Sequence, residues 1–293
     1  MRGISDTSKG IFFIIASAFF FALMAVFVRL AGDIFFVQKA FFRNAVAMVI
    51  ALASILCEAG KKGRGIFVIP KGALLFLFLR AAAGSVGIFG NFFAIDRLVL
   101  SDASILNKMA PFFTILFSFI LMKEKIRPVP LAAVACAFLG SFFVIKPGFD
   151  FSKMAPTLAG FLGGVGAGFA YACVRKLGKL GCNGKIIIMF FSAFSTLISL
   201  PYMIVNFNPM TARQWIFLLL SGAAAAGGQF SITAAYFHAP AGKISVYDYS
   251  QIIFSTLFGF LVFGQLPDIY SFIGYAIIVS MAVVNFAYNN RKQ

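Results

Sequence analysis

The sequence predicts an all-α membrane protein with ten transmembrane helices in two inverted five-helix repeats. Three observations support this prediction. Hydrophobic residues make up 61% of the 293 residues, charged residues only 12%, and the mean hydropathy is +0.96. The core of a water-soluble protein cannot use so much apolar surface, whereas a lipid bilayer can. The apolar residues also form ten runs of membrane-spanning length, and a long segment of the chain recurs at a fixed offset.

Each apolar run has about the 20 residues that an α-helix needs to cross the hydrocarbon core. The first run follows Arg2 and Lys9, as in a signal peptide, but its length and the nine later runs favour a mature helix. The expected spans are 10–30, 36–57, 72–95, 103–122, 129–145, 158–174, 186–205, 215–237, 244–263 and 269–288.

The recurring segment indicates an internal duplication. Residues 103–124 read ASILNKMAPFFTILFSFILMKE, and 244–265 read ISVYDYSQIIFSTLFGFLVFGQ, an offset of 141 from 103 to 244. The register continues upstream without a gap, so 76–95 aligns with 217–236. The identical pairs include Phe76/Phe217, Gly87/Gly228, Phe89/Phe230, Ser104/Ser245, Phe113/Phe254, Leu116/Leu257, Phe117/Phe258 and Phe119/Phe260.

The duplication places one repeat in residues 1–146 and the other in 155–290. Because five is an odd number of crossings, the second repeat starts on the opposite side of the membrane, and the repeats are expected to be inverted. Inverted repeats build secondary transporters, in which two conformations alternately expose a site at the bilayer midplane. The sequence lacks a G-x-x-x-x-G-K-[ST] motif, which argues against a primary pump.

Basic residues predict the orientation, because short cytoplasmic loops are enriched in Lys and Arg. With both termini in the cytoplasm, sixteen of the 25 Lys and Arg residues are cytoplasmic, six lie outside and three lie within spans. The protein is therefore expected to be a multi-pass protein of a cell membrane, with a bacterial inner membrane favoured. The cytoplasmic set is Arg2, Lys9, Lys61, Lys62, Arg64, Lys71, Lys123, Lys125, Arg127, Arg175, Lys176, Lys179, Lys185, Lys243, Arg291 and Lys292.

Two charges inside the spans mark the leading candidate site. At the repeat offset Asp248 aligns with Asn107 and Tyr249 with Lys108, so the two charges occupy nearly equivalent points. A charge at bilayer depth costs about 2.5 to 3.5 kcal/mol and usually faces a partner or a water-filled cavity. Substrate binding, proton coupling and mutual pairing all remain open for these charges. Pro111, shortly after Lys108, is expected to kink its helix towards a cavity.

An ammonium and a carboxylate at one depth would form a receptor for a zwitterion such as an amino acid. Arg43 and Arg80 add positive charge, however, and would instead favour an anion or a phosphate-bearing metabolite. For His238, the only histidine, a proton switch and an interfacial polar role are both open. The expected substrate-binding residues are Lys108, Asp248, Asn107, Tyr249, Tyr247, Arg80, Asn91, Gln229 and Tyr171.

Several motifs together resemble the EamA-type transporters of the drug/metabolite transporter superfamily. They are FFR at 41–43, LR-x3-G at 79–84, P-x12-E at 111–124 and YDYSQIIFSTLFGFLVFGQLPD at 247–268. Gln265 departs from the glutamate usual in the family, which puts a helix-end ion pair of the second half in doubt. The resemblance implies a central cavity lined by the third, fourth, eighth and ninth spans with parts of the first and sixth. It does not set the substrate, because the family covers amino acids, nucleotide-like metabolites, vitamins, amines and drugs.

These observations predict a secondary active transporter of small polar metabolites, amino acids or their derivatives, working by alternating access. The alternatives are an importer of a cofactor-like metabolite such as S-adenosylmethionine and an exporter of drug-like amines. An intramembrane enzyme is disfavoured because one histidine and one buried acid supply no catalytic cluster. A scaffold or sensor without a transport cycle is a third class.

The expected partners are a small-molecule substrate and the lipid bilayer, without nucleic acid. Proton coupling and a homodimer remain open. We expect no cofactor and no metal, because the four cysteines are scattered singly without C-x-x-C spacing.

Overall fold

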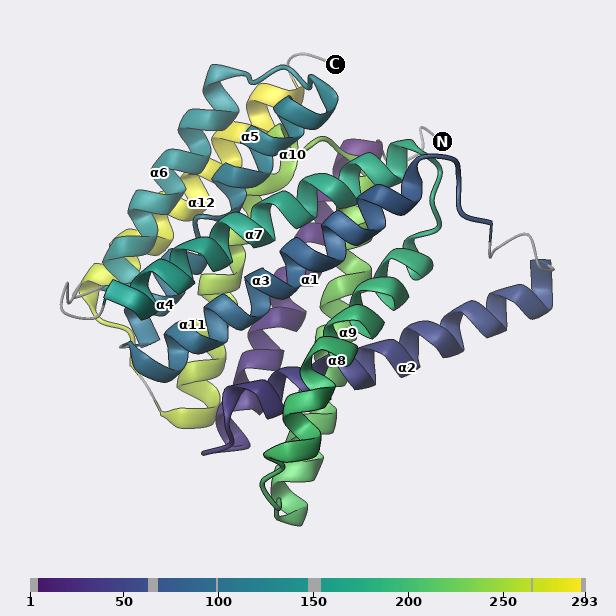
Figure 1. Ribbon diagram of the computed structural model, residues 1–293. Coiled ribbons are helices and arrows are strands. Elements are labelled where there is room, and N and C mark those ends of the chain that lie inside the picture. The colour runs from purple at the N-terminus through teal and green to yellow at the C-terminus, as the bar shows by residue number, and fades with distance from the viewer. Residues whose placement is uncertain (1–4, 63–67, 99, 147–153, 265, 291–293) are drawn as a thin grey trace.

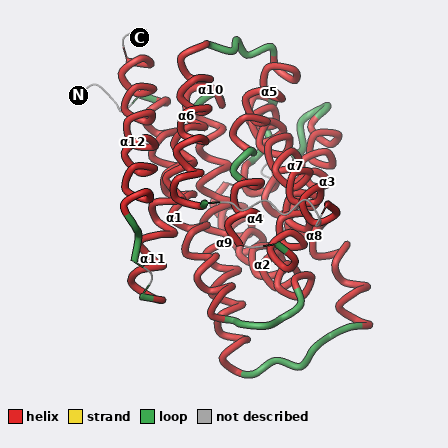
Figure 2. The backbone as a smooth tube through the Cα atoms, turned by 90° about the vertical axis from the view of Figure 1, so that its left-hand side faces the viewer, coloured by secondary structure: helices red, strands yellow, loops and turns green. Residues whose placement is uncertain are grey.

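The computed structural model describes residues 5–62, 68–98, 100–146, 154–264 and 266–290, which form helices joined by short loops (Figure 1). Most of these loops lie at the two ends of the helix bundle (Figure 2). The first half contains α1 Asp6–Leu30, α2 Phe36–Lys62, α3 Ala73–Arg97, α4 Leu100–Asn107, α5 Ala110–Met122 and α6 Pro128–Ile145. The second half contains α7 Met154–Lys179, α8 Gly184–Val205, α9 Ala212–His238, α10 Ala241–Ile244, the 3-10 helix η3 Ser245–Tyr249, α11 Ser250–Phe263 and α12 Ile269–Asn290.

Ten segments of the described chain are long and apolar enough to cross a membrane, and they confirm the predicted spans. Eight of them are single helices. The fourth, Ser104–Met122, and the ninth, Ala241–Phe263, are each interrupted. The start of α1 and the end of α12 lie at the same end of the bundle (Figure 1). Five of the Lys and Arg residues counted for the orientation lie outside the described residues. They are Arg2, Arg64, Arg291 and Lys292 of the cytoplasmic set and Lys153, which was counted among the six outside.

Polar side chains satisfy the free N–H groups at several helix starts. Ser5 accepts a hydrogen bond from the Ser8 N–H at the start of α1. At the start of α9, the Thr211 hydroxyl accepts the Gln214 N–H and the Gln214 side chain accepts the Thr211 N–H, which is a capping box. These bonds satisfy N–H groups that the first turn of each helix leaves without a helical partner.

Helices of the first half pair with helices of the second. The most extensive contacts are those of α1 with α9, α2 with α8, α3 with α7 and α6 with α12. Glycine makes the α3–α7 contact close: a Cβ on Gly87 would lie 3.2 Å from the Ala167 nitrogen, and one on Gly166 would lie 2.7 Å from the Ala83 oxygen. Small residues of this kind let helix backbones touch in lipid, where no hydrophobic effect drives helices together. Large apolar side chains such as Leu75 remain exposed for contact with lipid chains.

Asp268 joins the two halves at the end of the bundle remote from α1's first residue. It precedes α12, accepts the Ser271 N–H at 3.0 Å and forms an ion pair with Lys146, which follows α6. Gln265, the departure noted in the sequence, lies outside the described residues. The helix-end ion pair of the second half that the structure describes is the one between Asp268 and Lys146. The Lys146 hydrogen bond, followed by the Ser271 N–H, lowers the pKa of the Asp268 carboxyl to about 2.

The lowered pKa predicts an acid-sensitive contact between the halves. Above the ordinary carboxyl value of 3.8 the contribution of this contact to folding should be complete, and it should be lost as pH falls towards about 2. NMR titration of 13C-labelled aspartate side chains in detergent should place the Asp268 midpoint below the ordinary value. In the Lys146→Gln variant the midpoint should move back up. An unchanged midpoint in that variant would show that Lys146 does not hold the carboxylate.

The glycine contact predicts a second outcome. Gly166→Ala should lower the thermal midpoint of detergent-purified protein by several degrees, because its methyl group would meet the Ala83 backbone oxygen. Gly60→Ala is the matched control: Gly60 lies in α2 with nothing within 4 Å, so this variant should be neutral or slightly more stable. Equal midpoints for both variants would contradict close α3–α7 packing.

Candidate functional site

Two membrane-spanning helices break at equivalent points of the duplication. Lys108 and Met109 separate α4 from α5, and the η3 segment separates α10 from α11. At the repeat offset of 141 residues Lys108 corresponds to Tyr249, the last residue of η3. Pro111 explains the first break, because it stands at the start of α5. Non-helical backbone at membrane depth is tolerated only where protein buries it or where it lines a cavity.

The ammonium group of Lys108 bridges the two breaks. Its Nζ donates to Gln251 Oε1 at 2.7 Å, to Asp248 Oδ2 at 3.2 Å and to the Asp248 carbonyl oxygen at 3.4 Å. Lys108 is 6% exposed. The structure thus brings together the two charges that the sequence selected. In this conformation all three hydrogen-bond donors of the ammonium have acceptors within the protein.

A reciprocal hydrogen bond runs in the other direction. The Tyr249 hydroxyl donates to the Lys108 carbonyl oxygen at 3.0 Å, and Tyr249 is completely buried. The break in each half therefore has a carbonyl that accepts from a side chain of the other half: the Lys108 carbonyl from Tyr249, and the Asp248 carbonyl from Lys108. These two bonds give the carbonyl groups side-chain donors at points where lipid would offer none.

A cavity of about 130 Å³ lies beside the breaks. Helices α1, α2, α3, α7, α8 and α9 contribute to its wall together with Asn107 of α4, Ala110 of α5, and Asp248 and Gln251. Phe21, Phe92 and Phe191 supply aromatic surface. Six of the nine residues selected from the sequence line this cavity, namely Arg80, Asn91, Asn107, Tyr171, Gln229 and Asp248.

The other three selected residues lie elsewhere. Lys108 and Tyr249 do not line the cavity and instead link the two breaks by hydrogen bonds. The Tyr247 hydroxyl donates to the Ala282 carbonyl oxygen of α12 at 3.2 Å, so it points away from the cavity. Met24, Ile88, Phe92 and Phe191 line the cavity but were not selected, because apolar residues in an apolar helix carry no distinguishing sequence signal.

Two buried arginines face the cavity. Arg80 is 2% exposed, its Nη2 donates to Gln229 Oε1 at 2.9 Å, and its guanidinium carbon lies 4.0 Å from the centre of the Phe191 ring. Arg43 is 5% exposed and donates to the Asn44 Oδ1 and to the Met24 sulfur, both at 3.2 Å. Arg43 was not among the nine residues selected from the sequence, and it is part of the cavity wall.

A second, larger cavity of about 300 Å³ lies between α5, α6 and α10. Lys125, Arg127, Lys243 and Glu124 line it together with apolar residues. It lies near the end of the bundle and contains none of the nine selected residues. We therefore take the smaller cavity, which lies beside both helix breaks, as the candidate substrate site.

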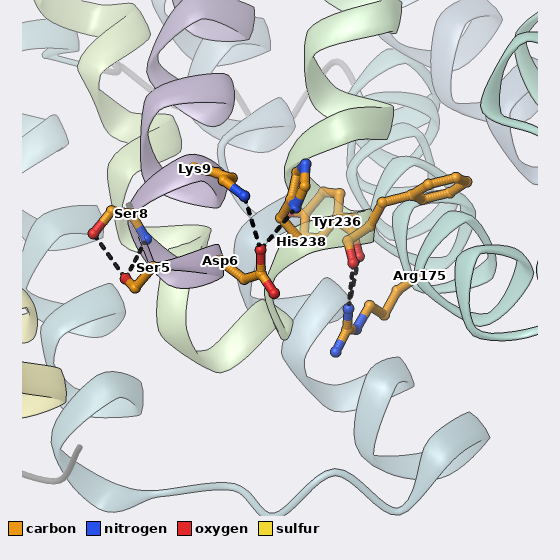
Figure 3. Close-up of polar contacts among 8 residues, drawn as sticks. Ser5, Asp6, Ser8, Lys9, Arg175, Tyr236 and His238 are labelled. Carbon is orange, nitrogen blue, oxygen red and sulfur yellow. Dashed lines mark hydrogen bonds and ion pairs between the residues drawn. The ribbon is translucent and has the colours of Figure 1, made fainter. Parts of the chain in front are cut away.

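Ion pairs tie helix ends together near α1's first turn. Figure 3 shows the Asp6 carboxylate between Lys9, at 3.4 Å, and the Nδ1 of His238, at 3.5 Å. Arg175 of α7 donates to the Tyr236 carbonyl oxygen at 3.0 Å at the end of α9 (Figure 3) and binds Glu124 at 3.1 Å. His238 lies at this end of the bundle and does not line the cavity. This position is the one expected of an interfacial polar residue.

Comparison with known proteins gives the class. The chain is 29% identical over 274 residues to a Pseudomonas aeruginosa protein named "Pseudopaline exporter CntI", covering 92% of this chain and 93% of the relative. It is 27% identical over 272 residues to the human "Solute carrier family 35 member G1", covering 88% and 73%. A solved structure described as "Crystal structure of protein" matches with a TM-score of 0.84 at 16% identity, over 98% of this chain and 99% of that chain. The ten-span fold and these relatives define a multi-pass membrane transporter, not an enzyme.

The EamA-like transporter family model matches residues 8–146, the region of the first predicted repeat. This match and the relatives named as transporters confirm the resemblance to EamA-type transporters seen in the sequence motifs.

The buried charge pair predicts a non-additive mutational cycle. Lys108→Met should strip Asp248 of its cation and lower the thermal midpoint strongly, since breaking a buried pair costs about 3 to 5 kcal/mol. Asp248→Asn should cost less, because Gln251 and the Asp248 carbonyl still accept from Lys108. The double variant should be more stable than the sum of the two single losses indicates. Strict additivity in detergent melts would mean that the two side chains do not interact.

Proposed function

We propose that this protein is a secondary active transporter that moves a small polar metabolite, an amino acid or a derivative of one, by alternating access. The observation that carries the proposal is the pair of broken helices at equivalent points of the two halves, beside one polar cavity. Discontinuous helices around a midplane site are the construction that transporters use to expose one site to either side of the membrane.

The proposed relation between the halves is an inverted repeat, residues 1–146 against 155–290. The helix contacts support it: exchanging the halves turns the α1–α9 pair into the α7–α3 pair and the α1–α11 pair into the α7–α5 pair. The α2–α8 and α6–α12 pairs map onto themselves under the same exchange. A two-fold axis in the membrane plane would produce this pattern.

Export is the direction we propose to test first, because one relative is named as an exporter of pseudopaline. Import of S-adenosylmethionine and export of drug-like amines remain the alternatives. Cytoplasmic termini in a bacterial inner membrane are proposed from the excess of Lys and Arg in the loops on that side. One chain supplies the whole cavity, so the proposed site does not require a homodimer. Proton coupling is proposed at Asp248, the one acidic residue among the described residues that line the cavity.

Counterflow in proteoliposomes tests the transport proposal. Vesicles loaded with unlabelled amino acids should accumulate the matching labelled solute only when they contain the protein. Ile88→Trp should reduce this uptake at least tenfold, because Ile88 lines the cavity and the larger ring would fill it. Val86→Trp is the matched control on α3: Val86 is 51% exposed to lipid, so its uptake should match the wild type.

Coupling is tested in the same vesicles by imposing a pH gradient. A gradient should drive uptake by the wild type but not by Asp248→Asn, which should retain counterflow. Equal loss of flux in Ile88→Trp and Val86→Trp, or no counterflow of any amino acid or derivative by wild-type protein, would remove the proposed function.

A further inference from the structure

The cavity carries more positive charge than the protein neutralises. Three charged side chains line it: Arg43, Arg80 and Asp248. Asp248 is already paired with Lys108 at 3.2 Å. Among the residues that the structure describes, no carboxylate lies within 4.0 Å of either guanidinium. The two guanidinium charges therefore have no counter-charge in the protein.

The polar partners of both guanidinium groups are neutral, and they do not occupy all the N–H donors of the arginines. A guanidinium offers five N–H donors and keeps its proton in proteins. Arg80 gives one of them to Gln229, while its Nε is buried with no hydrogen-bond partner. Arg43 contacts an amide oxygen and a thioether sulfur, and neither carries charge. Two unpaired charges in a buried site are costly to keep, and a partner that arrives from outside would offset this cost.

We infer that the substrate of this transporter is an anion, and that Arg43 and Arg80 bind its acidic groups. The inference rests on the proposed transport function and names the charge class of its substrate. Planar guanidinium groups bind carboxylates and phosphates through paired hydrogen bonds, so both kinds of acidic group fit this chemistry. An ammonium group of the same substrate would face Asp248. An acidic amino acid derivative meets all of these requirements.

The charge and size of the cavity separate this class from the alternatives. A cation such as a drug-like amine or the sulfonium of S-adenosylmethionine would add to the two unpaired guanidinium charges. The volume of about 130 Å³ is also well below the roughly 300 to 1,000 Å³ of sites for drug-sized ligands. A small anion fits both properties of the site.

Binding to detergent-purified protein tests the inference. The probes are L-glutamate, succinate, inorganic phosphate, L-glutamine and spermidine, each measured by the shift in thermal midpoint. A ligand of the folded state raises this midpoint by mass action. We expect one or more of the three anions to stabilise the wild type, and spermidine to have no effect. Glutamate or succinate acting alone would assign a carboxylate ligand, and phosphate acting alone would assign a phosphoryl group.

Variants then test the residues. Arg80→Gln should weaken anion binding at least tenfold. Arg80→Lys should recover part of the affinity, because it restores the charge without the paired donors. Asp248→Asn should weaken binding of L-glutamate more than binding of succinate, which has no ammonium group. Loss of succinate binding in Asp248→Asn with full binding in Arg80→Gln would overturn the assignment.

A ligand-free measurement guards against variants that fail to fold. Without ligand, Arg80→Met should be as stable as the wild type or more stable, because it removes an uncompensated buried charge. Lys108→Met should be clearly less stable, because it leaves Asp248 unpaired. An Arg80→Met midpoint as low as that of Lys108→Met would show that Arg80 serves the fold, and the inference would fall.

The outcomes for binding and for flux are separate. Anion binding without counterflow would keep the substrate class and remove the transport proposal. Counterflow of glutamine or spermidine that is unaffected in Arg80→Gln would keep transport and remove the anion. Stabilisation by none of the five probes would also overturn the inference.

Discussion

The ammonium group of Lys108 lies where two membrane helices lose their regular hydrogen bonding. It donates to one backbone and two side-chain acceptors of the opposite half. The Tyr249 hydroxyl in turn donates to the carbonyl oxygen of Lys108. In lipid an unsatisfied carbonyl is expensive, and these side chains supply donors to the Lys108 and Asp248 carbonyl groups. The cavity lies beside the breaks, and its position depends on this contact.

The rest of the bundle keeps this point buried and closely packed. Glycines on α3 and α7 bring the two backbones together, and a glycine-rich stretch of α9 receives Phe20 and Phe21 of α1. Such close contacts supply the packing that the hydrophobic effect cannot supply within a bilayer. Arg43 and Arg80 lie buried in the wall of the smaller cavity. The buried Lys108–Asp248 pair and both buried arginines are thus gathered around the two helix breaks.

The sequence predicted much of this arrangement and missed some of it for identifiable reasons. Apolar run length predicted all ten spans, and the repeat offset predicted that Lys108 and Asp248 would occupy nearly equivalent points. The break at η3 was missed because no proline marks it. The same break explains Tyr247: a 3-10 helix turns 120° per residue instead of 100°, so a side chain leaves the face that an α-helix would give it. The sequence also could not predict that Arg80 lacks an anionic partner, because ion pairing depends on which helices pack against each other.

The crossed hydrogen bonds at the breaks are nearly equivalent in position but not in chemistry. One half contributes a lysine where the other contributes a tyrosine, so exchanging the roles of the halves would not reproduce the same contacts. In the proposed alternating-access cycle, two conformations related by such an exchange would therefore differ in free energy, and one of them would be the resting state. The lysine–tyrosine difference at this aligned position is thus one source of a preferred facing direction in that cycle.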